Sequence, residues 1–204
     1  MISIINYGSG NIKAISNILE IEKIGHNVAE DKDDIRNCEK IILPGVGSFD
    51  HCMDRLNNSG LRDELEEQVV NRKKPILGIC IGLQMMANSS EEGKTEGLGW
   101  IDAKVRKFDE SLIEGDPKTP HMGWNTIKVV SSSEIFTNVD EVRGFYFIHS
   151  YHMCLNDESD TMTTSHFGYE FVSGINSENI YAVQFHPEKS HNNGVQVLKN
   201  FCNL

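Results

Sequence analysis

Cys80, His186 and Glu188 are the residues whose types and spacing best suit covalent chemistry. Cys80 is the central residue of GICIG at 78–82, the G-x-nucleophile-x-G spacing of a sharp strand-to-helix turn. His186 and Glu188 lie two residues apart, so in extended backbone their side chains face the same way and the carboxylate can orient the imidazole. A thiol nucleophile, a proton shuttle and a group that fixes its tautomer are what thiol-based acyl transfer requires.

The stretch 75–84, PILGICIGLQ, must position Cys80. The apolar residues at 76–79 predict a buried strand, and those at 83–87 predict the start of a helix. Glycines on either side allow a turn too tight for β-carbons, which should push the cysteine side chain into the open. A thiol at a helix N-terminus is favoured as the reactive thiolate. The alternative is a small core residue, since free cysteine is among the most buried residue types.

Two further glycine-rich turns follow predicted strands. PGVGSF at 44–49 comes after the strand expected at 40–43, and its bare backbone amides could complete an oxyanion site begun by the N–H of Ile81. The alternative for this motif is an ordinary turn. NYGSGN at 6–11 follows the first strand, but it lacks the third glycine and the lysine of phosphate-binding loops, so it indicates a tight strand-to-helix turn.

The order of the expected elements predicts the fold class. Up to residue 88, strands and helices alternate, which indicates a mostly parallel central sheet with helices on both faces. From Trp100 onward short β-like segments dominate, and these predict an antiparallel extension of the same sheet. A last helix is expected over 189–201, with Val195, Val197, Leu198 and Phe201 on its apolar face. The β-like segments lie at 103–108, 126–130, 145–149, 161–165 and 180–185. We expect one α/β domain over residues 1–204.

Composition excludes several classes of protein. With 39% hydrophobic and 24% charged residues, the chain is typical of a globular protein, and its formal charge of −11 argues against nucleic acid as a partner. No membrane span or signal peptide is apparent, so we expect no membrane association and a cytoplasmic location. Five cysteines without a C-x-x-C pair suggest neither disulfides nor zinc, and we expect no metal and no cofactor.

Six of the other seven histidines are expected to be surface residues or satisfied core residues. His149 is less clear, because FIHSY at 147–151 ends an apolar strand and could line the same cleft as Cys80.

GICIGLQ at 78–84, PGVGSF at 44–49 and QFHPEKS at 184–190 together resemble class I, triad-type glutamine amidotransferases, which have a flavodoxin-like fold. Within that family, PHMGWN at 120–125, FYFIHSYH at 145–152 and YGSGN at 7–11 resemble the glutaminase subunits of imidazole glycerol phosphate synthases. The similarity extends from the first strand to the last helix.

The resemblance implies a role for each matching residue. Cys80 would attack the side-chain amide of glutamine, forming a thioester and releasing ammonia, while His186 would move protons and Glu188 would orient His186. The positions that match the family's glutamine-binding residues and oxyanion strand are Gly45, Val46, Gly47, Ile81, Gln84, Ser150 and Tyr151.

The resemblance also implies a partner. In that family a (β/α)₈-barrel cyclase forms a heterodimer with the glutaminase, receives the ammonia through its interior, and makes imidazole glycerol phosphate and AICAR in histidine biosynthesis. The amide of the oxyanion strand faces away until the partner binds. Positions matching the interface are Gly10, Asn11, Trp124 and Lys189; for Lys189 the alternative is a solvated lysine.

Other functions remain open from the sequence. The stretch 97–101, His152 and the stretch 191–193 resemble paralogues that supply ammonia for the amination or amidation of surface-glycan sugars. A cysteine hydrolase or peptidase on the same fold would turn over amides unrelated to glutamine. A non-catalytic scaffold would require a damaged triad, and all three residues are present.

Overall fold

The first half of the chain builds four of the five strands in the parallel part of the central sheet, and β13, near the end of the chain, is the fifth. The computed structural model describes residues 1–115 and 118–204. Five strands lie parallel in the order β2, β1, β3, β4 and β13, as predicted for an α/β fold with a flavodoxin-like core. These strands are β1 (Ile2–Ile5), β2 (His26–Ala29), β3 (Lys40–Gly45), β4 (Ile76–Cys80) and β13 (Ile180–Val183).

The antiparallel extension is also confirmed, and it begins beyond β13. Strand β12 (Tyr169–Ser177) runs antiparallel to β13, followed by β10 (Tyr151–Leu155) and β6 (Ala103–Lys107). Three short or peripheral strands complete this sheet among the described residues: β5 (Ser89–Ser90), β8 (Lys128–Val129) and β11 (Thr161–Phe167). Strands β7 (His121–Asn125) and β9 (Phe145–His149) form a separate antiparallel pair.

Parts of the strand prediction were wrong. The segment 180–185 was assigned to the antiparallel part, but β13 is parallel to β4 and joins the two parts of the sheet. The strand expected at 126–130 is reduced to β8, because the preceding residues pair with β9 as β7 instead. The sequence pattern also missed β10 and β12, in which polar residues such as His152 and Ser173 are buried and so break the apolar alternation expected of a strand.

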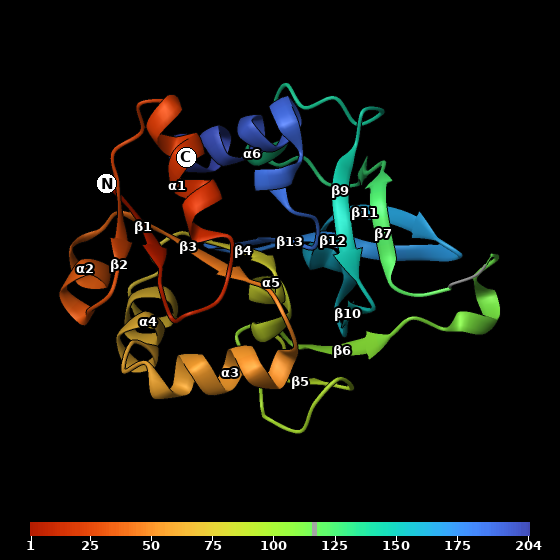
Figure 1. Ribbon diagram of the computed structural model, residues 1–204, viewed down its shortest axis with the longest axis horizontal. Helices are drawn as coiled ribbons and strands as arrows, with labels where there is room; N and C mark the ends of the chain where they lie inside the picture. The colour runs from red at the N-terminus through yellow and green to blue at the C-terminus, as the bar shows by residue number, and fades with distance from the viewer. Residues whose placement is uncertain (116–117) are drawn as a thin grey trace.

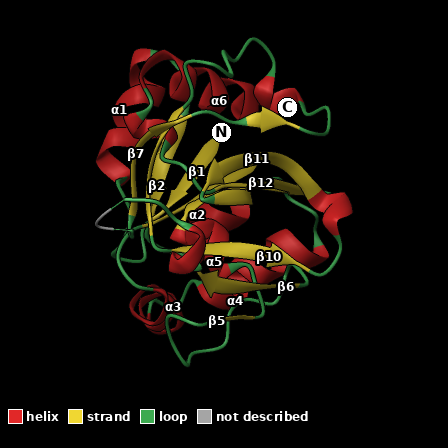
Figure 2. Ribbon diagram, turned by 90° about the vertical axis from the view of Figure 1, so that its right-hand side faces the viewer, coloured by secondary structure: helices red, strands yellow, loops and turns green. Residues whose placement is uncertain are grey.

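Helices cover both faces of the sheet, as expected (Figures 1 and 2). On one face lie α1 (Ile12–Ile21) and α6 (His191–Asn203), and on the other lie α3 (Phe49–Asn58), α4 (Arg62–Glu66) and α5 (Ile81–Met85). A short helix, α2 (Lys32–Asn37), follows β2, and a π-helical turn, η1 (Glu67–Asn71), continues α4. Single 3₁₀ turns lie at Glu110–Leu112 (η2), Glu134–Phe136 (η3), Glu158–Asp160 (η4) and Pro187–Lys189 (η5).

The core lies between the parallel strands and these helices. Ile4, Ile42 and Leu77 are fully buried, because helices on both faces exclude water from parallel strands and so select continuous apolar runs. On α6 the predicted apolar face is confirmed at Val197, Leu198 and Phe201, whereas Val195 is only half-buried.

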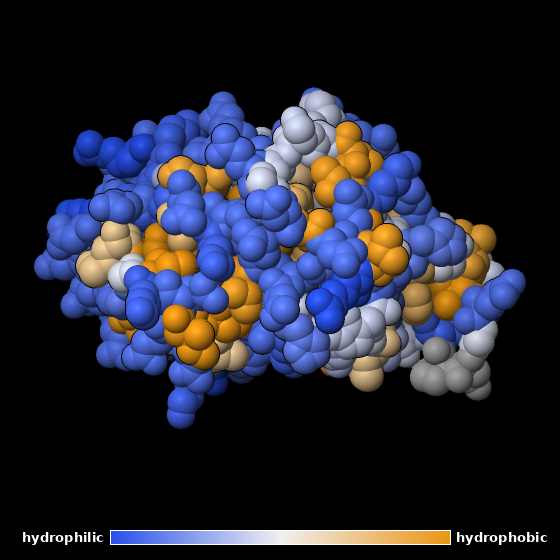
Figure 3. Space-filling model, turned by 90° about the horizontal axis from the view of Figure 1, so that it is seen from above, coloured by the Kyte–Doolittle hydropathy of each residue, from blue (hydrophilic) through white to orange (hydrophobic). Residues whose placement is uncertain are grey.

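The surface above this core is mainly hydrophilic on the face shown in Figure 3, where apolar patches are small and separate. Among the described residues, no helix combines the length and the apolar character needed to cross a membrane.

Candidate active site

The elbow predicted around Cys80 is present at the junction of β4 and α5. Cys80 adopts φ 55° and ψ −108°, a strained conformation that costs about 1–3 kcal/mol and is typical of functional turns. A β-carbon at Gly82 would collide with the carbonyl oxygen of Leu43, and one at Gly78 would lie only 3.0 Å from the carbonyl oxygen of Gly82 and from the backbone nitrogen of Leu83. The glycines are therefore required by close packing, as the spacing predicted.

The side chain of Cys80 is not pushed into the open, contrary to the prediction. Cys80 is only 3% exposed and lies at the wall of a cavity of about 400 Å³. The second half of the chain covers the turn, which the local spacing could not indicate. The cavity is lined by Asn11, Val46, Gly47, Cys80, Ile81, Gln84, Glu92, Pro120, Ile148, His149, Ser150, Tyr151, His186 and Lys189.

His186 and Glu188 form a buried pair beside Cys80. The distance from His186 Nδ1 to Glu188 Oε1 is 2.7 Å, and the side chains are only 2% and 1% exposed. The extended geometry predicted for this segment holds at His186 but ends there, because Pro187 begins a 3₁₀ turn that contains Glu188. Asn11, from the turn after β1, donates a second hydrogen bond of 2.7 Å to the same carboxylate oxygen.

Charges in this pair are strongly coupled. Burial alone would lower the pKa of His186, but Cys80 and Glu188 outweigh it and raise that pKa to about 10. Burial opposes ionisation of Glu188 too, yet His186 and Asn11 hold the pKa of its carboxyl below the ordinary value. The sulfur and the carboxylate therefore both favour the protonated form of His186, whose Nε2 is left to face Cys80.

Two further groups approach the sulfur of Cys80. The amide Nε2 of Gln184 donates to it at 3.7 Å, and the carbonyl oxygen of Ile148 lies 4.0 Å away. Strand pairing explains the position of Gln184, because Val183 is the register partner of Ile79 in β4. Sequence analysis did not single out Gln184, although its spacing of two residues from His186 was a usable signal.

Gln84 forms a polar cluster on the opposite side of Gln184. Its amide Nε2 donates to the carbonyl oxygen of Tyr151 and to Oε1 of Gln184, both at 3.0 Å. Its oxygen Oε1 has no hydrogen-bond partner among the described residues. An unpartnered buried acceptor next to a cavity is suited to a donor on a bound ligand.

This geometry agrees with what the chain resembles. A family model described as glutamine amidotransferase class-I matches residues 4–204. The chain belongs to the class I glutamine amidotransferase family. Imidazole glycerol phosphate synthase subunits HisH from Leptospira borgpetersenii and Bdellovibrio bacteriovorus are 43% and 46% identical to it, each over 100% of both chains.

Solved structures show the same fold at lower identity. PurLQS from Thermotoga maritima gives a TM-score of 0.69 at 20% identity, over 99% of this chain and 97% of the other. The glutaminase domain of CTPS from Trypanosoma brucei gives 0.62 at 14% identity, over 98% and 91%. At these identities the two solved structures show the fold of this glutamine amidotransferase and not the roles of its residues.

In the segment predicted to be the oxyanion strand of this amidotransferase, the central backbone amide is already hydrogen-bonded. Val46 N–H donates to Ser9 Oγ at 3.1 Å, and Ser9 Oγ donates back to the carbonyl oxygen of Val46 at 2.7 Å. The thiol of Cys52 also donates to that carbonyl, at 3.3 Å. Val46 and Gly47 line the cavity, whereas Gly45 packs behind it against Gly82. In this conformation the Val46 amide is not free to bind an oxyanion.

His149 lines the cavity, as the sequence left open, and belongs to a buried chain of neutral groups. Its Nδ1 donates to the carbonyl oxygen of Tyr151 at 2.8 Å, and its Nε2 lies 3.0 Å from Nδ1 of His121. Because a carbonyl can only accept, the neutral His149 accepts from His121. Burial holds the pKa of His149 well below its ordinary value. The pair therefore fixes the backbone at Tyr151, next to Ser150.

Glu92 is a cavity residue that sequence analysis missed. Its Oε2 accepts from the backbone N–H of Phe49 at 2.8 Å, and burial raises the pKa of its carboxyl. No motif marked Glu92, because it lies in a polar loop whose path depends on the tertiary structure.

Of the residues predicted to contact a partner, Asn11 and Lys189 line the cavity, Gly10 lies in the turn after β1, and Trp124 lies on β7. Lys189 is exposed and stands 5.6 Å above the ring of Tyr146. Trp124 is 48% exposed and stacks on His191 with ring centroids 5.2 Å apart. Gly10 packs against Pro44 in the turn that carries Asn11.

Proposed function

We propose that this chain is the glutaminase subunit of an imidazole glycerol phosphate synthase. It hydrolyses glutamine to glutamate and ammonia as one amidotransferase domain over residues 1–204, in the cytoplasm, for histidine biosynthesis. The observation that carries this proposal is the buried line of Cys80, His186 and Glu188 at a cavity of about 400 Å³. Full-length similarity to HisH subunits supports the pathway.

In the proposed mechanism, Cys80 attacks the side-chain carbonyl carbon of glutamine. The C–N bond breaks, His186 gives its Nε2 proton to the leaving nitrogen, and ammonia departs from a thioester on Sγ. His186, now neutral, takes a proton from water, which attacks the thioester and releases glutamate and the thiolate. Glu188 holds the tautomer of His186 throughout, through the bond at Nδ1.

We propose that the other cavity residues hold the substrate. The unpartnered oxygen of Gln84 suits the ammonium group of glutamine, and so does the carboxylate of Glu92. Ser150 and Tyr151 provide the segment against which the backbone of the substrate lies. Ile81, at the start of α5, supplies an oxyanion amide.

Val46 supplies a second oxyanion amide in this mechanism only after it leaves Ser9. The free subunit should consequently be a slow glutaminase. We propose that binding of a (β/α)₈-barrel cyclase as heterodimer partner, at a surface that includes Gly10, Asn11, Trp124 and Lys189, favours the change. A direct passage to the cyclase would keep ammonia unprotonated, since in neutral water it is mostly ammonium and no longer a nucleophile.

The test measures glutamate release from glutamine by the purified chain, alone and with a cyclase partner. We expect slow release alone, faster release with the partner, and formation of imidazole glycerol phosphate when the cyclase substrate is present. Cys80→Ala should abolish release in both cases. If Cys80→Ala retains the wild-type rate, the proposed mechanism is wrong.

A further inference from the structure

Gln184 contacts the nucleophile and has no role in the mechanism above. It is fully buried and follows β13, where its backbone N–H donates to the carbonyl oxygen of Ser173 at 2.9 Å and keeps the chain in the line of the strand. Residues two apart in extended backbone face the same side. Gln184 and His186 therefore both point at Cys80, one as a neutral donor and the other as a charged one.

Both the nitrogen and the oxygen of the Gln184 side-chain amide form hydrogen bonds. Its nitrogen lies 3.7 Å from Sγ of Cys80, and its oxygen accepts from Nε2 of Gln84 at 3.0 Å. Only the nitrogen of an amide donates, so turning it toward the sulfur places the oxygen toward Gln84. A thiolate accepts a hydrogen bond better than a thiol does, because donors to charged groups are bound more strongly.

The orientation of Gln184 in turn decides the orientation of Gln84. Both contacts of the Gln84 nitrogen are to acceptors, the carbonyl oxygen of Tyr151 and Oε1 of Gln184. If the amide of Gln84 turned by 180°, its Oε1 would face these two acceptor oxygens and no hydrogen bond would form. Its Oε1 is consequently the atom left unpartnered within the described part of the chain.

We propose that Gln184 links the nucleophile to Gln84, a proposed glutamine-binding residue. Its side-chain N–H stabilises the Cys80 thiolate, and its side-chain carbonyl fixes the amide of Gln84 so that Oε1 of Gln84 is free to bind glutamine. The contact with the thiolate stands without any substrate. The second half of the proposal, on glutamine, rests on the proposed function.

The first experiment follows alkylation of Cys80 by iodoacetamide against pH, without glutamine, using mass spectrometry of the Cys80 peptide in the intact chain. In Gln184→Met, which has no amide, we expect the pH profile to move up by about one unit, the effect of one hydrogen bond to a charged group. Gln184→Glu should move it at least as far, because a carboxylate oxygen then faces the sulfur.

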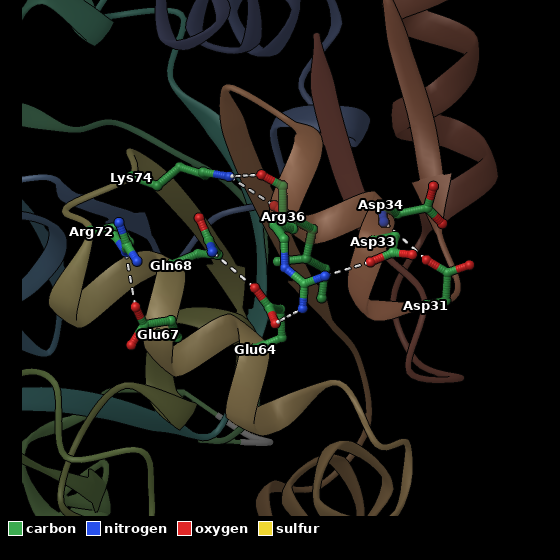
Figure 4. Close-up of polar contacts among 10 residues, drawn as sticks. Asp31, Asp33, Asp34, Arg36, Glu64, Glu67, Gln68, Arg72 and Lys74 are labelled. Carbon is green, nitrogen blue, oxygen red and sulfur yellow. Dashed lines mark hydrogen bonds and ion pairs between the residues drawn. The ribbon is translucent and has the colours of Figure 1, made fainter.

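Gln68→Met is the matched control, because it makes the same change at another buried glutamine. Gln68 is 8% exposed and donates to Oε1 of Glu64 at 2.8 Å, in the network of Figure 4, which lines no part of the cavity. We expect its Cys80 profile to match that of the wild type. Thermal unfolding identifies the variants that fold. If Gln184→Met does not fold, the result for Gln184→Glu decides the test.

The second experiment separates kcat from KM for glutamine. Gln184→Glu keeps an acceptor for Gln84, so its KM should stay within about twofold of the wild type while kcat falls about tenfold. Gln184→Met loses both contacts and should also raise KM. An unchanged alkylation profile in folded Gln184 variants overturns the proposal. A shifted profile in a chain that never hydrolyses glutamine would overturn the proposed function and leave the sulfur contact standing.

Discussion

Two ion pairs in this protein have the same length and very different surroundings. His186 and Glu188 are 2.7 Å apart with side chains 2% and 1% exposed, and Arg36 and Glu64 are 2.7 Å apart with side chains 53% and 10% exposed (Figure 4). Away from water each charge of the first pair depends on its partner. In the second pair, called the surface pair below, solvent reaches the half-exposed guanidinium of Arg36 and screens it. The distance between charges therefore does not reveal what the pair contributes.

The two pairs also differ in what they connect. Arg36 forms ion pairs with Asp33 in α2 and with Glu64 in α4, two short helices that both belong to the first half of the chain. Glu188 accepts from Asn11, which is 177 residues away, and its partner His186 faces Cys80 on another strand. The buried pair lies beside Cys80 at the cavity, so its loss should affect chemistry, whereas the surface pair lines no part of the cavity and its loss should not.

Among variants of the two pairs, His186→Gln should have the largest effect. The variant loses the group that moves protons to and from the nucleophile, so kcat for glutamine hydrolysis should fall about 10³-fold. Steady-state glutamate release, with thermal unfolding to verify the fold, measures this. If kcat falls by less than tenfold, another group must move the protons.

Glu188→Gln should lower kcat less, by about 10²-fold, because a neutral amide still contacts His186 but no longer stabilises the imidazolium. This variant also has a pH signature. The pKa of His186 is raised from 6.5 and that of Glu188 is lowered from 4.5, so the pair stabilises the fold fully between those values. That contribution is lost as pH rises toward about 10, and as pH falls below 4.5.

The difference in Tm between wild type and Glu188→Gln should accordingly be largest between pH 4.5 and 6.5 and smaller on either side. Melting curves at several pH values measure it. A difference that is constant with pH would mean that the two charges are not coupled in the fold.

Ser9→Ala should have a smaller effect and the opposite sign. It removes the partner of the Val46 N–H, so the oxyanion strand turns more easily and partner-free glutaminase activity should rise about fivefold, the value of one neutral hydrogen bond. Ser16→Ala is the control, since Ser16 bonds His26 away from the cavity. Lower activity in Ser9→Ala than in the control would show that Ser9 supports the active conformation.

Arg36→Met should have the smallest effect. Glutaminase activity should be unchanged, and Tm should fall by a few degrees at most, because Glu64 is still bonded by Gln68 and surface pairs contribute little. Raising the salt concentration should shrink even this difference. A loss of activity in Arg36→Met would break the distinction between the two pairs.

Local patterns predicted the elements of the first half well. Most strands and helices up to residue 87 follow expectation, because buried parallel strands leave apolar runs and tight turns leave glycines, but the short helix α2 was not predicted. Prediction was poorer after Trp100, where β10 and β12 carry polar residues buried by long-range pairing. Cys80, His186 and Glu188 were predicted from two local patterns, the glycines around Cys80 and the two-residue spacing of His186 and Glu188, and the fold brings the two patterns to one cavity.

The amino-acid sequence by itself indicated Cys80 as the candidate nucleophile, the likeness of the chain to class I glutamine amidotransferases and the alternation of strands and helices, since each is carried by short motifs of residues close together in the chain. Only the tertiary structure decided that Cys80 is buried, that Asn11 contacts Glu188, that Gln184 contacts the sulfur and that Ser9 occupies the Val46 amide. Each of these contacts joins residues at least 37 positions apart, and such pairs are brought together by strand order and packing.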